Sequence, residues 1–145
     1  MNHQEVKVLH QELIALINHT IEKKVDVYHV NYGLDKNLTR LQSAVDAINK
    51  HVPQELKDLE SKVWEAVKTV NPPEFDPKVL TKKDQKRRDE LMVEHNKAMQ
   101  EPDDYAVYFL NPEKCEDLKI EFPFFQILKK FFPVEADKPE VKEAE

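Results

Sequence analysis

The sequence predicts a mainly α-helical fold, and its composition, its shortage of glycine and its hydrophobic periodicity all support this. Of its 145 residues, 34% are charged and 40% are apolar, whereas globular proteins average about 25% and about 45–50%. Gly33 is the only glycine, and apolar residues recur every three or four positions in long stretches. We expect one α-rich domain over residues 1–132. It would comprise a helical hairpin or three-helix bundle, an additional charged helix, and a small C-terminal β-hairpin plus a short helix.

The first helix is predicted over residues 2–24. Asn2 can cap its N-terminus, and Glu5 follows three residues later, as in a capping box. One face is apolar, and the opposite, polar face should contact solvent. The apolar positions are Val6, Leu9, Leu13, Leu16 or Ile17, and Ile21.

A longer amphipathic stripe runs through residues 27–52. Its steps of three and four residues, with one stutter, are typical of a long helix or a coiled coil. Gly33 lies inside the stripe and costs about 1 kcal/mol relative to alanine. We interpret it as a point where a neighbouring backbone approaches closely; alternatively, the helix breaks there and begins at Asp35.

Pro53 interrupts this stripe, which continues over residues 56–70. The first helix, at ~23 residues, is only about 35 Å long, whereas a straight stripe from residue 27 to 70 would span about 65 Å. Either the chain folds back at Pro53 into a monomeric three-helix bundle, or it continues straight and leaves half the stripe for a homodimer. The helix-start residues behind Pro53 favour folding back, and a homodimer remains an alternative.

A loop and a charged helix follow. Residues 71–80 contain three prolines and predict a loop. Thr81 can cap the next helix, residues 82–100, with Asp84 completing an imperfect capping box. Because charged residues dominate this helix, we expect it to project into water or to lie across the outside of the fold.

The C-terminal part has a different pattern. Residues 105–110 form a continuous apolar and aromatic run, residues 118–122 alternate with period two, and turn-forming residues 111–114 lie between them. This pattern predicts a β-hairpin with a long loop. Residues 124–132 predict a short amphipathic helix. Residues 133–145, with five acidic residues and few large apolar ones, predict a disordered acidic tail.

Residue usage excludes several catalytic and cofactor-binding motifs. A single glycine cannot build a phosphate-binding loop or a GxSxG nucleophile elbow. A single cysteine, Cys115, cannot form an intrachain disulfide or a cysteine-rich zinc site. No carboxylate stands in an apolar run that would raise its pKa. We therefore expect no enzymatic activity, no catalytic residue and no cofactor.

The six histidines raise the question of a metal site. His19 and Glu22 could share an ion on one helix face, as could Glu90 and Glu94 beside His95. A helical carboxylate site needs Glu-x-x-His motifs on facing helices, and the sequence has no such motif. We interpret the histidines as solvent-exposed helix residues and expect no metal.

A cluster of phenylalanines is the candidate protein-binding surface. Aromatic side chains concentrate at interface hot spots, and five of the seven phenylalanines lie close together near the C-terminus. They can cap the core of the helical hairpin, stay exposed as anchors for a partner, or do both. They are Phe122, Phe124, Phe125, Phe131 and Phe132.

The basic segment 82–88 is the candidate for nucleic-acid binding, through phosphate contacts. However, Asp84, Asp89 and Glu90 interleave it and offer partners three or four residues away, and the net charge of the chain is −6. We therefore favour a solvated helix surface. The basic residues are Lys82, Lys83, Lys86, Arg87 and Arg88.

Residues 32–41, Tyr-Gly-Leu-Asp-Lys-Asn-Leu-Thr-Arg-Leu, follow a short β-branched link and lead into the long helix. Together with residues 94–100 and the strand-like segments after them, this stretch resembles a small family of uncharacterised tailed-phage (siphovirus and prophage) proteins. The resemblance covers about half of the chain. The family carries no known catalytic residues, so the resemblance implies only a phage or prophage origin.

These observations favour a non-catalytic protein-interaction module that acts on a host or virion protein. The alternative is a nucleic-acid-associated accessory protein that uses residues 82–88. The sequence has no run of about 18 apolar residues and no leader-like N-terminus. We therefore expect no membrane partner and a cytoplasmic location, which is the host cytoplasm for a phage-encoded protein.

Overall fold

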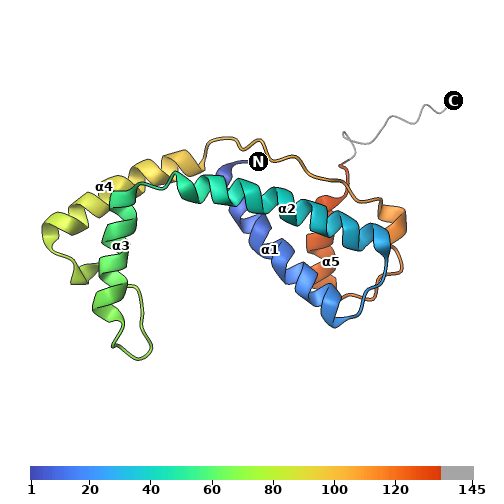
Figure 1. Cartoon of the computed structure of the whole chain (residues 1–145), viewed down its shortest axis with the longest axis horizontal. Helices are drawn as coiled ribbons and strands as arrows, with labels where there is room; N and C mark the ends of the chain where they lie inside the picture. Colours follow the sequence, from blue (N-terminus) through green and yellow to red (C-terminus); the bar gives the residue numbers. More distant parts are fainter. Residues whose placement is uncertain (135–145) are drawn as a thin grey trace.

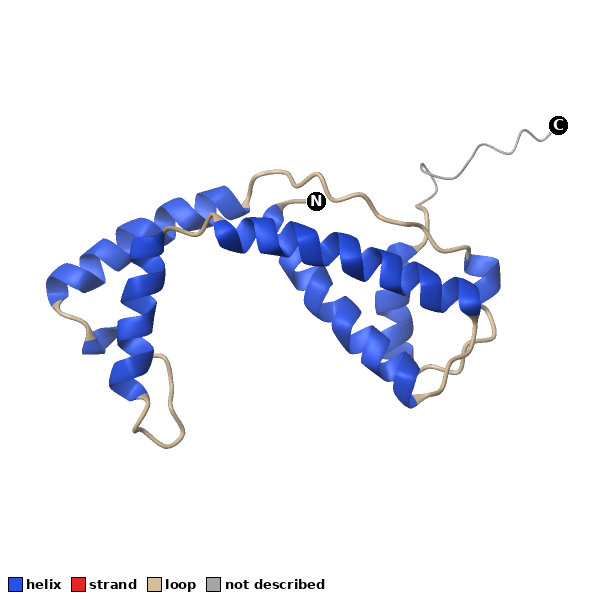
Figure 2. Ribbon diagram, viewed as in Figure 1, coloured by secondary structure: helices blue, strands red, loops and turns tan. Residues whose placement is uncertain are grey.

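A computed structural model of the chain describes residues 1–134 and shows a mainly helical protein (Figures 1 and 2). Nearly all of the predicted tail lies outside these residues. No strand forms within them, and three short 3-10 helices accompany the α-helices. The elements in order are α1 (His3–Glu22), α2 (Tyr28–Lys50), α3 (Gln54–Val67), η1 (Pro77–Val79), α4 (Lys82–Met99), η2 (Pro112–Cys115), α5 (Phe122–Leu128) and η3 (Lys129–Phe131).

The helices form an arch with two parts (Figure 1). The first part, which we call the body, contains the α1–α2 hairpin with α5 packed against α1. The second part, which we call the arm, contains α3 and α4. Each part has its own buried cluster of apolar side chains, and the cluster of the body is much the larger.

Helix α1 confirms the predicted N-terminus. The Asn2 side chain accepts a hydrogen bond from the backbone N–H of Glu5 at 2.8 Å, and the Glu5 carboxylate accepts one from the N–H of Asn2 at 2.9 Å. The predicted apolar face is buried as far as Leu16. Ile21 was expected on that face but is exposed, because the last turn of α1 buries His19 and Thr20 instead.

Helix α2 runs unbroken through Gly33, so the alternative start at Asp35 is wrong. A neighbour does approach Gly33 closely, but it is a side chain rather than a backbone. A Cβ atom added to Gly33 would overlap the Cδ2 atom of Leu110. Only glycine therefore lets Leu110 occupy its buried position against α2.

At Pro53 the chain turns sharply, and α3 leads away from the body (Figure 1). The chain neither folds back at Pro53 into the predicted three-helix bundle nor continues straight, so neither of the two predicted arrangements is formed. The apolar side of α3 packs against α4, where Leu56 and Leu59 meet Leu91. The stripe of α2 is covered by α1 and by segments that follow α4.

Helix α4 connects the arm to the body. Its N-cap is Thr81, whose hydroxyl accepts a hydrogen bond from the N–H of Asp84 at 3.1 Å, as predicted. Leu91 belongs to the buried cluster of the arm, and Met99 at the other end belongs to that of the body. This charged helix therefore contributes to both clusters rather than only lying outside the fold.

The predicted β-hairpin is wrong. Residues 105–110 are extended but pair with no strand within residues 1–134. They belong to a segment, residues 103–111, that we call the strap, and side chains of α2 bind several of its backbone groups. The second predicted strand is a short loop, and its end is bound to α1.

Candidate functional site

Asn37 of α2 fixes the strap in place. This fully buried amide accepts hydrogen bonds from the N–H of Tyr108 at 2.9 Å and from the hydroxyl of Tyr105 at 2.7 Å. It donates to the carbonyl oxygens of Tyr108 at 2.8 Å and of Gly33 at 2.9 Å. An amide side chain offers two N–H donors and one oxygen with two lone pairs. The Asn37 side chain therefore makes all the hydrogen bonds that it can make.

Further hydrogen bonds hold the backbone of the strap. The N–H of Asp103 donates to the carbonyl of Met1 at 2.9 Å. The guanidinium of Arg40 donates to the carbonyl of Ala106 at 3.0 Å. The N–H of Leu110 donates to the carbonyl of Phe131 at 2.8 Å. The N–H of Asn111 donates to Nε2 of His29, also at 2.8 Å. The strap is therefore bound to α2 along most of its length and is also bound to the C-terminal segment.

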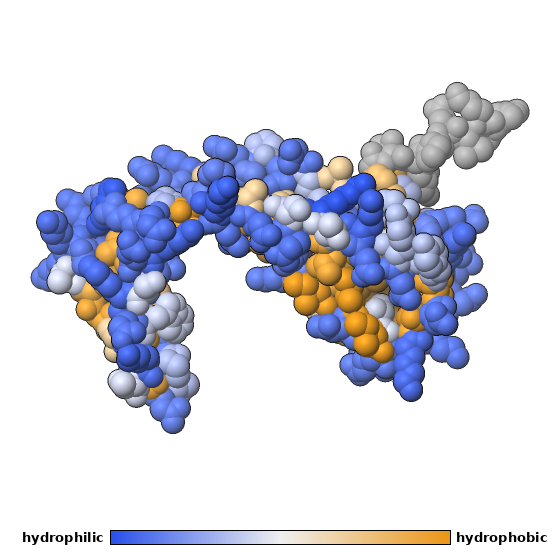
Figure 3. All heavy atoms as spheres, viewed as in Figure 1, coloured by the Kyte–Doolittle hydropathy of each residue, from blue (hydrophilic) through white to orange (hydrophobic). Residues whose placement is uncertain are grey.

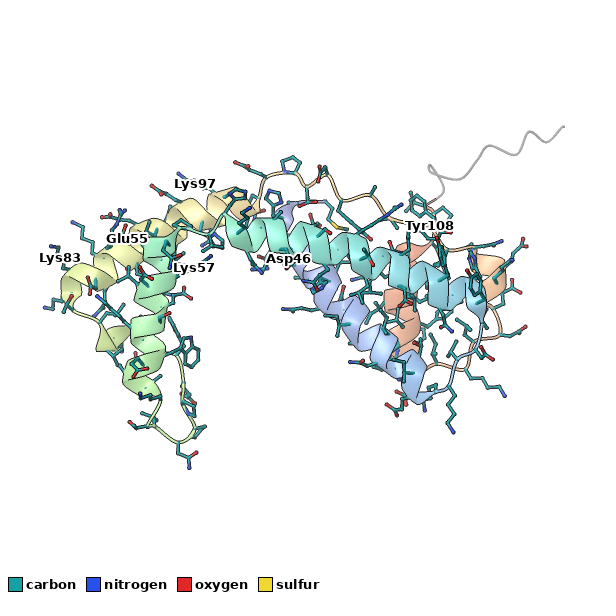
Figure 4. All side chains as sticks on the ribbon, viewed as in Figure 1. Asp46, Glu55, Lys57, Lys83, Lys97 and Tyr108 are labelled. Atoms are coloured by element: carbon teal, nitrogen blue, oxygen red, sulfur yellow. The ribbon has the colours of Figure 1, made fainter. Side chains whose placement is uncertain are left out.

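The strap completes a row of aromatic side chains, which we call the aromatic ladder: Tyr28, Tyr32 and Tyr108, with Arg40 at its end. The rings of Tyr28 and Tyr32 stack with centroids 5.8 Å apart, and Tyr32 meets Tyr108 edge-on at 5.7 Å. The guanidinium carbon of Arg40 lies 5.7 Å from the centre of the Tyr108 ring. Tyr28 is 79% exposed and Tyr32 is 42% exposed. Tyr108 lies beside the N-terminal half of α2, far from the arm (Figure 4).

Sequence reasoning missed this ladder. The available signal was the four-residue spacing of Tyr28 and Tyr32, which places both rings on one side of the helix. Tyr108 could not be added, because its position depends on the distant contact with Asn37.

The five phenylalanines predicted to bind a partner differ in burial. Phe131 is fully buried in the body, and Phe124 stacks on His19 with centroids 3.9 Å apart. Phe125 and Phe132 are half-buried and meet edge-on at 6.3 Å. Phe122 is 72% exposed. Most of the cluster therefore packs in or against the core, and Phe122 is the member that projects from it.

The interpretation of the histidines as exposed is wrong for His19. This residue is buried, and its Nε2 accepts a hydrogen bond from the N–H of Glu121 at 3.1 Å. Since the ring also stacks on Phe124, His19 holds the start of α5 against α1. Within residues 1–134, no group of three or more histidine, cysteine or acidic side chains is placed to hold a metal ion.

The two arginines of the basic segment hold α4 against α3. Arg87 makes two hydrogen bonds to the carboxylate of Glu55, from Nε at 2.9 Å and from Nη2 at 2.8 Å. These bonds lower the pKa of Glu55 and raise that of Arg87. The guanidinium of Arg88 lies 4.8 Å from the centre of the Phe75 ring and 3.4 Å from the carboxylate of Glu60.

The sequence had suggested acidic partners within α4 itself, but the shorter contacts of Arg87 reach across to α3. The three lysines of the segment stay exposed on the surface of α4. Within segment 82–88, Lys82, Lys83 and Lys86 would therefore be the residues left for phosphate contacts.

A cavity of about 360 Å³ lies where the body meets the arm. Its walls include His3, His51 and His95, together with acidic residues at the start of the strap. Asp103 among them is bound to Nδ1 of His3 at 2.7 Å. This pairing ties the strap to the first turn of α1.

Comparisons with known protein families, with characterised proteins and with solved structures find no match to this chain. Within residues 1–134, no helix has both the length and the apolar character that crossing a membrane requires.

Proposed function

We propose that the protein is a non-catalytic interaction module that binds another protein through the aromatic ladder and Phe122. The ladder carries this proposal. Tyr28 and Tyr32 expose large apolar surfaces, and Arg40 lies against Tyr108 at the end of the ladder. Tyrosine and arginine are among the residues enriched at binding hot spots.

The contacts within the ladder support this proposal. Tyr28 and Tyr32 stack on each other, and both backbone groups of Tyr108 are bound by Asn37. Contacts that hold a side chain before binding reduce the conformational entropy that it loses when a partner binds. The resemblance to tailed-phage proteins suggests a host or virion protein as the partner.

Nucleic-acid binding is the rival proposal. Tyrosines can stack on bases, and Lys82, Lys83 and Lys86 are exposed. Against this, Arg87 and Arg88 are engaged by acidic side chains of α3. Protein binding therefore fits the described charges better.

A capture experiment with matched variants tests the proposal. The tagged protein and the double variant Tyr28→Ala/Tyr32→Ala would be used to capture partners from the cells in which the protein acts. Val93→Ala, which trims another exposed apolar side chain, is the control. We expect a protein that the native chain and the control retain and the double variant loses.

The affinity for that partner should change little between ~50 and ~200 mM salt, whereas binding through several phosphate contacts would weaken by orders of magnitude. Equal capture by both variants would contradict the role of the ladder. Steeply salt-dependent binding to oligonucleotides would favour the rival.

A further inference from the structure

The molecule is hollowed between the arm and the body, and apolar surface lines the body side of the hollow (Figure 3). This surface lies along the groove where α1 meets α2. Ile14 is 41% exposed and Ile21 is 68% exposed, and Ile17 and Leu38 are half-buried between them. A shallow cavity in the groove brings Ile17 and Ile21 of α1 together with Asp35 of α2.

Acidic side chains flank this apolar groove. Asp35 and Asp46 are eleven residues apart on α2, about three turns, so they lie on the same side of the helix. Figure 4 shows Asp46 on the side of α2 that faces the hollow. We call the groove with these two carboxylates the body face.

The side of the arm that faces the hollow carries basic and apolar side chains, which complement the acidic and apolar body face. Lys57, Trp64 and Lys68 are spaced by seven and four residues, so they share one side of α3. Figure 4 shows Lys57 directed toward the hollow. Trp64 is 48% exposed, and Lys68 also pairs with Glu65. Among residues 1–134, no acidic group lies within ion-pair distance of Lys57. We call this side the arm face.

The two faces of one chain are held apart. The arm is connected to the body through the turn at Pro53 and through the C-terminal end of α4, where Met99 is buried in the body. The side chains of Asn2 and Gln100 add a hydrogen bond of 3.1 Å at that junction. Trp64 also meets the ring of Phe75, with centroids 5.3 Å apart. Within residues 1–134 both faces nevertheless remain largely exposed, although their charges and apolar groups match.

We propose that a second copy of the chain covers them. The two copies are related by a two-fold axis, and the arm of each copy lies in the hollow of the other. Each arm face therefore contacts the body face of the other copy. Because a two-fold axis repeats the contact, the assembly closes at two copies. Two such contacts of about 600–800 Å² each would together reach the size of a standard interface.

This dimer differs from the one suggested by the sequence. That dimer needed an apolar stripe that continued straight through Pro53. In the structure the apolar positions of α2 and α3 are buried in the clusters of the body and the arm. The proposed interface also uses a surface other than the aromatic ladder, so it stands independently of the proposed function.

Charge reversal in a sedimentation experiment tests the proposal. We expect the native chain to dimerise reversibly between ~1 and ~500 µM. Lys57→Glu and Asp46→Lys should each raise the dissociation constant at least about tenfold, since each reversal turns the two symmetry-related Lys57–Asp46 contacts of the dimer into contacts between like charges. The double variant should recover most of the native affinity. Lys83→Glu, at the tip of the arm (Figure 4), changes net charge as Lys57→Glu does and should leave the dimer intact.

Mixed cysteine variants test which faces meet. A short bifunctional thiol reagent should give a covalent dimer when Lys57→Cys and Asp46→Cys are mixed, and much less with either variant alone. The native Cys115 is buried and should not compete. A chain that stays monomeric at every concentration would overturn the proposal. So would a dimer unaffected by both reversals, or a Lys57→Cys/Asp46→Cys double variant that cross-links only within one chain.

Discussion

Asn37 binds both backbone groups of Tyr108, accepting from its N–H at 2.9 Å and donating to its carbonyl at 2.8 Å. A neighbouring strand would normally supply this pair of hydrogen bonds. A single buried amide supplies it here, from a helix. This relationship explains how the strap can be extended and half-buried without belonging to a sheet, because buried backbone groups need partners of some kind.

Replacing Asn37 by alanine should destabilise the fold strongly. The change leaves the N–H and the carbonyl of Tyr108 and the hydroxyl of Tyr105 without their partner, and each such group costs about 1–3 kcal/mol. We expect the free energy of unfolding to fall by about 3–5 kcal/mol in urea denaturation. Asn49→Ala, at an exposed position of the same helix, should change it by less than about 0.5 kcal/mol. Similar losses for the two variants would contradict the role of Asn37.

Gly33 and Leu110 should be energetically coupled. Alanine in place of Gly33 would gain about 1 kcal/mol of helix propensity, but its Cβ would overlap Cδ2 of the buried Leu110. We expect a net loss of about 1–3 kcal/mol from Gly33→Ala in the native chain. In a Leu110→Val background, which lacks that atom, the same change should be neutral or stabilising. Thermal unfolding of the four proteins of this cycle measures the coupling, and an equal effect in both backgrounds would exclude it.

Tyr105 should give the protein an alkaline transition. Burial raises the pKa of its phenol to about 12 from the ordinary 10.0, and the positive charge of Arg40 offsets part of this rise. The folded state therefore favours the neutral form. The stability that Tyr105 contributes is present below pH 10 and is lost as the pH rises through about 12. Ultraviolet titration of the tyrosinates should show this late step, and Tyr105→Phe should abolish it. Tyr28→Phe is the control, and a late step that survives Tyr105→Phe would contradict the assignment.

Sequence reasoning succeeded where the determinants are neighbours along the chain. The capping pair of Asn2 and Glu5 fixed the start of α1, and Thr81 fixed that of α4. It failed at the strap, where residues 105–110 have the composition of a strand but their partner is Asn37, up to 71 residues away. The local pattern predicted the extended backbone correctly, but it did not indicate which group would form hydrogen bonds with its N–H and carbonyl groups.

The same limit applies to Pro53 and to the site. Proline indicates that the helix ends, but the direction of α3 depends on Leu91 and Met92, two apolar residues in a helix dominated by charge. In the aromatic ladder, Tyr28 and Tyr32 could have been paired from their spacing. Tyr108 joins them only because the strap is bound to α2.

The arm should unfold before the body. Its buried apolar side chains are fewer than those of the body, and Leu91→Ala should cost about 2–4 kcal/mol there. They are Leu56, Leu59, Val63, Val67, Leu80 and Leu91. A small cluster weakened by this amount opens locally while the rest of the fold persists. Hydrogen exchange should therefore accelerate in α3 and the first half of α4, with α1 and α2 unchanged. By contrast, Leu41→Ala, at a fully buried position of the body, should accelerate exchange in α1 and α2. If Leu91→Ala accelerates exchange in α1 and α2 as much as in α3, the two clusters unfold as one unit.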